Sequence, residues 1–280
     1  MKRKKPDGLR YLACVSDLHS GCRLALMPRN GFVLDEGTEV KPSKIQLKLN
    51  DMWDEYWQWV EDETNGEPYG VVVNGDATEG VHHGSVTQWT QNLDDQVRCS
   101  RVLLEDVARK AAGRFYMVRG TEAHVGKSAQ QEEALARELG AVPNEEGQHA
   151  HWQLWLRLGG HLIHFAHHIG TTSSPFAASA GLQREMVSGY VESGRWGDEP
   201  AAMYVRSHRH FSSEVREPSK HGVTAVVVTP AWQLKTPFGH KTAGRMMQPQ
   251  VGGILICVGD NGPYVKSKVW RIERSKEVTL

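Results

Sequence analysis

The feature that most constrains the fold of this chain is a repeated local pattern, in which a short apolar run ends in aspartate or histidine. Such runs predict buried strands, and the helical periodicities between them predict alternating strands and helices. In open α/β sheets, ligands bind where the carboxyl ends of strands meet. We therefore expect one sheet edge to collect these side chains: Asp17 and His19 after 11–15, Asp76 after 70–73, Glu122 and His124 after 115–118, His167 at the end of 161–167, and His208 and His210 after 202–205.

The remaining segments indicate how the layers are arranged. Helical spacing of apolar positions marks residues 45–60, 93–111 and 177–191. Ser128 with Gln131 predicts a capping box for a further helix that ends at Gly140. Further strands are predicted at 152–158, which forms a hairpin with 161–167, and at 223–229, 253–258 and 264–272. Alternating strands and helices, followed mainly by strands, predict an α/β sandwich with helices on its outer faces.

Composition restricts the class of protein. The 280 residues fit a single domain over 1–280, and the acidic and basic residues balance at 33 each. That balance weakens nucleic-acid binding without excluding it. The basic N-terminus lacks a following apolar segment and no run of about 18 apolar residues occurs, so we expect neither a signal peptide nor a membrane span. Four cysteines without C-x-x-C spacing predict reduced thiols and a cytoplasmic protein.

The aspartates and histidines at the strand ends indicate a site for two divalent cations. Two cations roughly 3.5–4 Å apart neutralise charge on phosphoryl oxygens and acidify a water, as hydrolysis of a phosphate ester at neutral pH requires. A shared carboxylate holds such a pair together, and Asp76 on its Gly-Asp turn suits this role. Asp17 and His19 lie two residues apart, which in extended backbone points both side chains to one metal. His208 and His210 repeat the spacing.

The motif set resembles the calcineurin-like metallophosphoesterase superfamily over residues 10–212, in the family's order: D-x-H at Asp17 and His19, the Gly75-Asp76 turn, the lone His167, and H-x-H at His208 and His210. The resemblance implies a metallophosphoesterase-like α-β-β-α sandwich of two mixed β-sheets flanked by helices. It also implies two ligand sets that share Asp76. One contains Asp17, His19, Asp76 and His210, and the other contains Asp76, His167 and His208.

The third motif departs from the family, which usually has G-N-H with asparagine as a metal ligand. Here the segment reads Gly120-Thr121-Glu122-Ala123-His124, a variant that resembles phage-borne members of the family. Thr121 replaces the asparagine, so Glu122, His124 or water completes the second ligand set. His124 and the shared Asp76 are the catalytic candidates, with His124 binding phosphate or protonating the leaving group. Alternatively, His124 is a loop histidine bonded to the backbone.

Other polar residues near the motifs have supporting roles in this interpretation. Glu79 occupies the fifth place of the G-D-x-x-E form, where it would orient a ligand histidine. His82 and His83 are predicted on the rim of the site. His164 and His168 compete with His167 for the fourth motif, and His167 is preferred because it ends the strand.

Three residues are candidates for substrate binding: Arg119, Trp232 and Lys235. Arg119 either clamps a phosphate or pairs with a nearby acid. Trp232 and Lys235 belong to a long segment, 230–250, whose aromatic and basic residues are typical of surfaces that stack bases and contact phosphates. In the alternative interpretation the aromatic residues of this segment attach it to the core.

These observations favour a metal-dependent hydrolase of phosphate mono- or diesters, with nucleic acid or nucleotides as candidate substrates. Mixed Asp/His ligation favours two Mn²⁺ ions, with Zn, Fe, Ni or Mg as alternatives. A second hypothesis is a catalytically degenerate family member that serves as a protein-interaction scaffold, for which Thr121 is the sequence support. A closed structural zinc site fits poorly, because no cysteine accompanies the histidines.

Overall fold

A six-stranded mixed sheet forms one central layer of the computed structural model, which describes residues 8–82, 84–170, 177–219, 222–242, 248–272 and 278. Its strand order is β13-β12-β1-β4-β5-β6. The neighbouring strands β1, β4, β5 and β6 run parallel to one another, whereas β12 runs antiparallel to both β1 and β13. The strands are β1 (Tyr11–Val15), β4 (Tyr69–Asn74), β5 (Phe115–Val118), β6 (Ala150–His151), β12 (Gln250–Gly259) and β13 (Gly262–Arg271).

A five-stranded mixed sheet packs against the first, in the order β10-β11-β9-β8-β7. Here β8, β9 and β11 are parallel, and β7 and β10 are antiparallel edge strands. Buried apolar side chains of both sheets, such as Cys14, Val72, Phe165 and Val205, form the core between them. The strands are β7 (Leu154–Leu158), β8 (His161–Phe165), β9 (Met203–Arg206), β10 (Ser213–Ser219) and β11 (Gly222–Val228).

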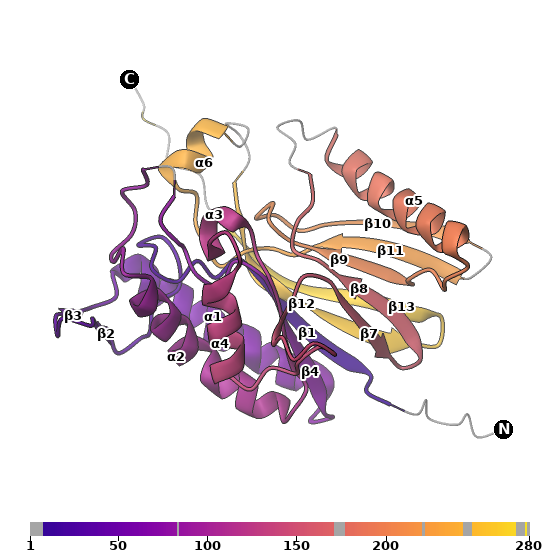
Figure 1. The fold of residues 1–280 in the computed structure, drawn as a ribbon, viewed down its shortest axis with the longest axis horizontal. Coiled ribbons are helices and arrows are strands. Elements are labelled where there is room, and N and C mark those ends of the chain that lie inside the picture. Colours follow the sequence, from indigo (N-terminus) through magenta and orange to yellow (C-terminus); the bar gives the residue numbers. More distant parts are fainter. Residues whose placement is uncertain are drawn as a thin grey trace.

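Helices cover the outer face of each sheet (Figure 1). On the first sheet, the helices α1 (Lys44–Thr64), α2 (Leu93–Ala111) and α4 (Gln130–Glu138) bury residues such as Trp53 and Leu104 against the strands. On the second sheet, α5 (Ala178–Trp196) packs Leu182 and Met186 against Val226 and its neighbours. The result is the α-β-β-α sandwich, with two mixed sheets flanked by helices, that the sequence predicts.

Short elements complete the described part of the chain. They are the ribbon β2 (Phe32–Val33) with β3 (Glu39–Val40), and the short helices α3 (Glu122–Val125) and α6 (Pro237–Thr242). The predicted capping box at Ser128 is wrong, because α4 begins after Ala129, whose backbone is left-handed and whose side chain gives no cap hydrogen bond. No helix among the described residues is both long and apolar enough to cross a membrane.

The topology determines where the site forms. The strands β1, β4, β5, β8, β9 and β11 end in loops that carry the polar motifs, and both sheets present these ends on the same side of the sandwich. Backbone hydrogen bonds join the loops directly: the amide of Asp17 donates to the carbonyl of Gly75 at 2.9 Å, and that of Ser207 donates to the carbonyl of His167 at 2.9 Å. These bonds hold the loops in pairs within each sheet, and the side chain of Asn74, which donates to the hydroxyl of Ser207 at 2.7 Å, joins the two pairs.

Candidate metal centre

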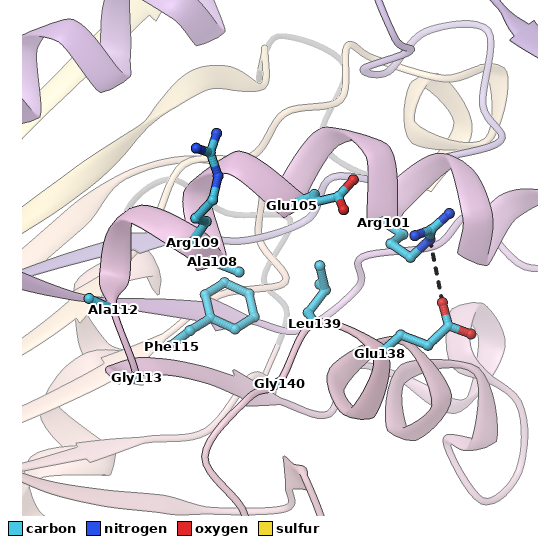
Figure 2. Close-up of a pocket in the computed structure, with 10 residues that line it drawn as sticks. All are labelled: Arg101, Glu105, Ala108, Arg109, Ala112, Gly113, Phe115, Glu138, Leu139 and Gly140. Atoms are coloured by element: carbon cyan, nitrogen blue, oxygen red, sulfur yellow. Dashed lines mark ion pairs between the residues drawn. The ribbon is translucent and has the colours of Figure 1, made fainter.

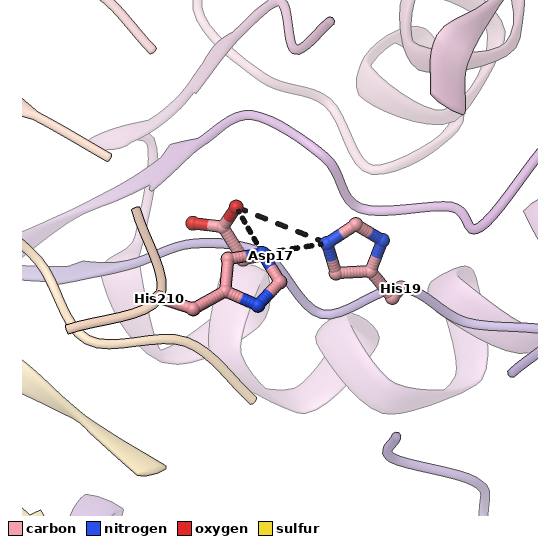
Figure 3. Close-up of side chains that lie close together, drawn as sticks. All are labelled: Asp17, His19 and His210. Atoms are coloured by element: carbon pink, nitrogen blue, oxygen red, sulfur yellow. Dashed lines mark hydrogen bonds and ion pairs between the residues drawn. The ribbon is translucent and has the colours of Figure 1, made fainter. Parts of the chain in front are cut away.

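The first group of converging donors consists of Asp17, His19 and His210 (Figure 3). Asp17 and His19 follow β1, and His210 follows β9. The Nε2 atom of His210 lies 3.2 Å from Oδ1 of Asp17 and 3.2 Å from Nε2 of His19, and the latter lies 3.8 Å from the same Oδ1. Two ligands of one metal ion at about 2.1 Å stand roughly 3.0–3.5 Å apart, so these donors have the spacing of a metal site.

The second group consists of Asp76, His167 and His208. Asp76 follows β4, His167 follows β8 and His208 follows β9. Nε2 of His167 lies 3.0 Å from Oδ2 of Asp76 and 3.9 Å from Oδ1 of Asp17. That second distance connects the two groups, which is the arrangement a two-cation site needs. All six residues that the sequence predicts as the core ligands are therefore brought together.

Two buried atoms in these groups support a cation as their missing partner. Oδ1 of Asp17 and Nε2 of His167 are both buried, and other candidate ligands lie nearest to them: Nε2 of His210 is 3.2 Å from the oxygen, and Oδ2 of Asp76 is 3.0 Å from the nitrogen. The other carboxylate oxygen of Asp17 accepts from the hydroxyl of Ser16 at 2.6 Å. Buried polar atoms are almost always bonded, and a metal ion placed among these atoms would be a partner for all of them.

The backbone at the site is left-handed. Asp17, His19, Asp76, His208 and His210 have φ values of 54°, 47°, 53°, 71° and 56°. This conformation costs a residue with a Cβ roughly 1–2 kcal/mol, and such strain concentrates at functional sites. The expectation of an extended Asp17-Leu18-His19 segment is therefore wrong. The two side chains still converge, because the turn and not the alternation of a strand directs them.

Two glycines allow the loops to approach one another. A Cβ on Gly75 would lie 2.5 Å from Nδ1 of His167, and a Cβ on Gly120 would lie 2.0 Å from Oδ1 of Asp76. Both distances are shorter than any real Cβ contact. The Gly-Asp turn therefore requires glycine at position 75 so that His167 can cross it, and the third motif requires glycine at position 120 so that Asp76 fits beneath.

Thr121 has a role that the sequence did not reveal. Its amide donates to Oδ1 of Asp76 at 2.7 Å, and its hydroxyl lies 3.1 Å from Oδ2 of the same residue. Thr121 thus orients the carboxylate of Asp76. The structure does not bring Glu122 to the donors, because its side chain is exposed and belongs to none of the described donor groups; its ligation of a metal stays a prediction. It begins α3, where it faces solvent.

His124 lies beside the first group, and its donor atom converges with those of His19 and Asp76. Its Nδ1 atom is 2.7 Å from the carbonyl oxygen of Glu79. A carbonyl only accepts, so Nδ1 carries the proton and Nε2 keeps its lone pair. Burial lowers the pKa of His124 to about 4, which keeps the imidazole neutral. The backbone bond of the alternative interpretation is therefore present, and it leaves Nε2 available to the site.

Glu79 contacts His19 on the side of the ring that faces away from the other donors. Its Oε2 atom lies 3.0 Å from Nδ1 of His19 and accepts from the side-chain Nε2 of Gln233 at 2.8 Å. Its Oε1 atom is 3.4 Å from Nε2 of His82. The carboxylate of this buried residue sets the orientation and tautomer of His19, as its place in the G-D-x-x-E motif predicts. His82 lies at the rim, and His83 falls outside the described residues.

A chain of buried hydroxyl groups links the two sheets below the donors. The side chain of Asn74 donates to the hydroxyl of Ser207 at 2.7 Å. The Ser207 hydroxyl in turn lies 2.7 Å from the hydroxyl of Thr229. The Thr229 hydroxyl lies 2.6 Å from that of Ser16, and Ser16 donates to Asp17. These residues come from the ends of β1, β4, β9 and β11. A fully buried network of this kind holds its members in one arrangement.

Glu132 is a second supporting residue that sequence reasoning missed. It lies in the first turn of α4 and is fully buried. Its carboxylate accepts from the amide of Ala77 at 3.0 Å and from the amide of Gly120 at 2.5 Å. One side chain thus joins the turns that carry Asp76 and Thr121. The spacing of the motifs contained no signal for it, because the bond forms only when α4 packs beneath both turns.

The electrostatics of the site favour added positive charge. Burial by itself would raise the pKa of Asp17, but attraction to His167 and His210 holds it well below the usual range. Burial would likewise lower the pKa of His167, but Asp76 and Asp17 raise it to about 10. Without a metal, the imidazole of His167 takes up a proton, which balances part of the carboxylate charge. A divalent cation supplies the same charge, so we expect metal binding to release protons.

Two predicted substrate-binding residues are placed elsewhere. Trp232 is fully buried in the core between the six-stranded sheet and its helices, where its ring centroid lies 4.8 Å from that of Trp53. It therefore cannot stack on a base. The guanidinium of Arg119 is occupied: it donates to the carbonyls of Ala150 and Ser128 at 2.7 and 3.1 Å and pairs with Glu133 at 3.3 Å. Both residues are structural, which corrects the prediction.

Lys235 is half-buried in the segment that precedes α6, and its contact with a phosphate stays a prediction. Part of the long basic segment, residues 243–247, falls outside the described residues. Among the competing histidines, His167 is the one that faces Asp76, whereas His164 faces the opposite side of its sheet beside Arg206. The ring of His168 lies 4.8 Å from that of His208, at the margin of the site.

A pocket lies at the edge of the six-stranded sheet where β5 begins, opposite the edge that carries the donor groups (Figure 2). It measures about 340 Å³ between α2 and the end of α4, and an ion pair of 3.5 Å between Arg101 and Glu138 crosses its margin. Phe115, the first residue of β5, forms its floor. The pocket therefore sits where β5 begins, whereas the donors sit where the strands end, and it contains none of them.

Comparison with known proteins gives matches among solved structures only. No protein-family model and no curated protein matches the chain. Vps29 from Cryptosporidium parvum matches with a TM-score of 0.40 and 12% identity, over 94% of this chain and 99% of that one. Protein TM1076 from Thermotoga maritima matches with a TM-score of 0.37 and 11% identity, over 94% and 100%. A single mutant of Vps29 from Entamoeba histolytica gives 0.35 and 10%, over 93% and 99%. The fold class therefore rests on the layers and strand order described above.

Proposed function

We propose that this chain is a metal-dependent phosphoesterase of the calcineurin-like metallophosphoesterase type. The observation that carries the proposal is the convergence of two aspartates and four histidines, from four strand ends, into two adjacent donor groups. A structural role alone does not account for them, because burying several carboxylates and imidazoles together costs free energy unless a partner compensates their charge. The order of the motifs along the chain, which resembles that family, supports the same reaction class.

The residues would hold two divalent ions. Asp17, His19 and His210 would bind one ion, His167 and His208 the other, and Asp76 would contact both. When bound, the two ions would neutralise the phosphoryl oxygens and acidify a water molecule for attack. The chain would orient these ligands through Glu79, Thr121 and the hydroxyl network. We propose Mn²⁺ because mixed oxygen and imidazole ligation suits it.

His124 would accept or donate a proton at the edge of the site. Its Nδ1–H is committed to the carbonyl of Glu79, and its pKa is about 4, so Nε2 meets the substrate as a lone pair. In this state His124 accepts a proton or completes the metal ligands. It would act as an acid on the leaving oxygen only after it had first taken up a proton. This order of events refines the role of leaving-group acid that the sequence suggested.

The substrate class that we propose is a phosphate mono- or diester. With Trp232 buried and Arg119 occupied, the support for nucleic acid or nucleotides reduces to Lys235 and the basic composition of the segment around it. Hydrolysis of a polymeric substrate such as DNA is therefore a separate proposal, which requires its own assay beside that of small esters.

A hydrolysis screen tests the proposal. Metal-stripped protein would be assayed with added Mn²⁺, Zn²⁺, Fe²⁺, Ni²⁺ or Mg²⁺ against p-nitrophenyl phosphate, its bis-ester and single-stranded DNA. We expect metal-dependent turnover of at least one small ester, abolished in Asp76→Asn and retained in Asp106→Asn, an exposed control on α2. If the wild-type protein binds fewer than two ions at saturation and hydrolyses none of these esters, the scaffold hypothesis replaces the enzyme.

A further inference from the structure

A second cavity lies on the outer face of the five-stranded sheet, away from the donor groups. It measures about 650 Å³ and is bordered by α5 on one side and by the outward side chains of β7, β8 and β9 on the other. Among the described elements, α5 packs mainly on β10 and β11, and Trp155 of β7 on the same face of the sheet is 48% exposed (Figure 1). This volume is in the range of cavities that bind a small ligand or a few residues of a peptide.

One buried polar atom among the lining residues has no partner. Nε2 of His164 makes no hydrogen bond within the part of the chain that the structure describes, although the residue is only 6% exposed. The guanidinium of Arg206 donates to Nδ1 of His164 at 3.2 Å. Nδ1 therefore accepts, and the proton of the neutral ring sits on Nε2. His164 lines the cavity, so a ligand with an acceptor group would supply the missing partner of that N–H.

The aromatic walls of the cavity favour a flat or cationic group. Trp155 stacks one face on His164, with centroids 4.2 Å apart, and is 48% exposed. Trp196, at the end of α5, is 73% exposed. Large exposed indoles are unusual unless they serve a contact, and an indole face attracts guanidinium and ammonium groups.

The charges of the lining point to a cation. Four carboxylates line the cavity, at Glu185, Glu192, Asp198 and Glu199, against the guanidiniums of Arg157 and Arg206. Arg206 pairs with Glu185 at 2.9 Å, Arg157 pairs with Glu199, and Glu192 pairs with Arg195 outside the lining. Asp198 has no ion pair among the described residues. An anionic ligand would meet this excess of carboxylates, whereas a cation would pair with Asp198 and stack on an indole.

We propose that this cavity binds a short basic segment of a partner polypeptide, with an arginine side chain against Trp155 and Trp196 and a peptide carbonyl at Nε2 of His164. A peptide meets both demands at once, because it carries a cation and a neutral acceptor a few ångströms apart. A free amine offers the cation without the acceptor. The proposal is independent of the phosphoesterase function, since no residue of the donor groups lines the cavity.

Isothermal titration of the full chain with acetyl-Gly-Arg-Gly-amide tests the proposal. Matched probes are the peptide with citrulline in place of arginine, which is neutral and of the same shape, and propylguanidine, which carries the same single charge without a peptide. We expect the arginine peptide to bind about tenfold more tightly than either probe. Equal binding of the citrulline peptide would overturn the role of charge. Equal binding of propylguanidine would overturn the peptide in favour of a small free cation.

Variants locate the binding in this cavity. We expect Trp196→Ala to weaken the arginine peptide about fivefold or more, and Asp198→Asn to weaken it and reduce its salt dependence. Trp152→Ala is the matched control, because Trp152 is 58% exposed and does not line the cavity. Thermal melting would verify that each variant is folded. Unchanged affinity in both Trp196→Ala and Asp198→Asn, or no binding at millimolar peptide, would overturn the proposal.

Discussion

The two donor groups of the candidate metal centre are supported in different ways. In the first, side chains hold the ligands: Glu79 faces Nδ1 of His19, and Ser16 donates to Asp17. In the second, backbone groups do much of this work, since Nδ1 of His167 lies 2.6 Å from the carbonyl oxygen of Asn74. Thr121 orients Asp76 but adds no strong ligand, so in the proposed arrangement the second group has one ligand fewer than the first. We therefore expect the first group to bind its ion more tightly.

The largest effect should come from Asp76, the residue that we propose contacts both ions. Asp76→Asn removes the charge that would stabilise both ions, so metal content should fall in both groups and turnover by orders of magnitude. Elemental analysis after dialysis, together with ester hydrolysis, measures both quantities. Two retained ions with near-normal turnover would show that the two groups are not coupled through Asp76.

A pair of histidine variants separates the groups. His210→Ala should abolish the tighter class of Mn²⁺ binding, and His208→Ala should abolish the weaker class and leave the tighter one in place. Calorimetric titration of metal-stripped protein resolves the two classes. His240→Ala on α6 serves as the control, because His240 is exposed. A wild-type protein with a single class of two equal sites would contradict the proposed asymmetry.

Replacement of Thr121 tests why the second group differs. Thr121→Asn offers an amide oxygen as the absent ligand and should tighten the weaker class about tenfold, whereas Thr121→Val removes the hydroxyl that holds Asp76 and should lower turnover by about tenfold. Thr38→Val, an exposed threonine, is the control. The same metal titration measures the first effect. If Thr121→Asn leaves the weaker class unchanged, the lost ligand is not the cause of the asymmetry.

The smallest expected effect concerns the support beneath the second group. Glu132→Gln replaces one acceptor oxygen with an NH₂ group, so one of the amides of Ala77 and Gly120 loses its partner. The free energy of unfolding should fall by about 1–3 kcal/mol, which urea denaturation can measure. Glu138→Gln on the same helix is the control, because its side chain is 53% exposed. Equal stability of the two variants would remove Glu132 from the support of the site.

Much of the fold followed from local patterns. The strands Tyr11–Val15 and Phe115–Val118 and the helix Leu93–Ala111 have the predicted bounds, because apolar periodicity reports directly on which face of an element is buried. The strand Ser213–Ser219 was not predicted. Its charged and polar residues suit an edge strand and carry no apolar alternation. The cap of α4 was wrong for a similar reason, since its start depends on the loop that precedes it.

The sequence by itself determined the six candidate ligands and their order, because side-chain chemistry and position at strand ends are local properties. Only the tertiary structure decided which residues assist them. Trp232 and Trp53, or Glu132 and the amides of Ala77 and Gly120, are distant in the chain and meet only when layers pack. Thr121 could not be recognised as the partner of Asp76 from its type, since a hydroxyl serves many neighbours equally well. Which neighbour it finds is set by the packing of both sheets, and no local pattern records that.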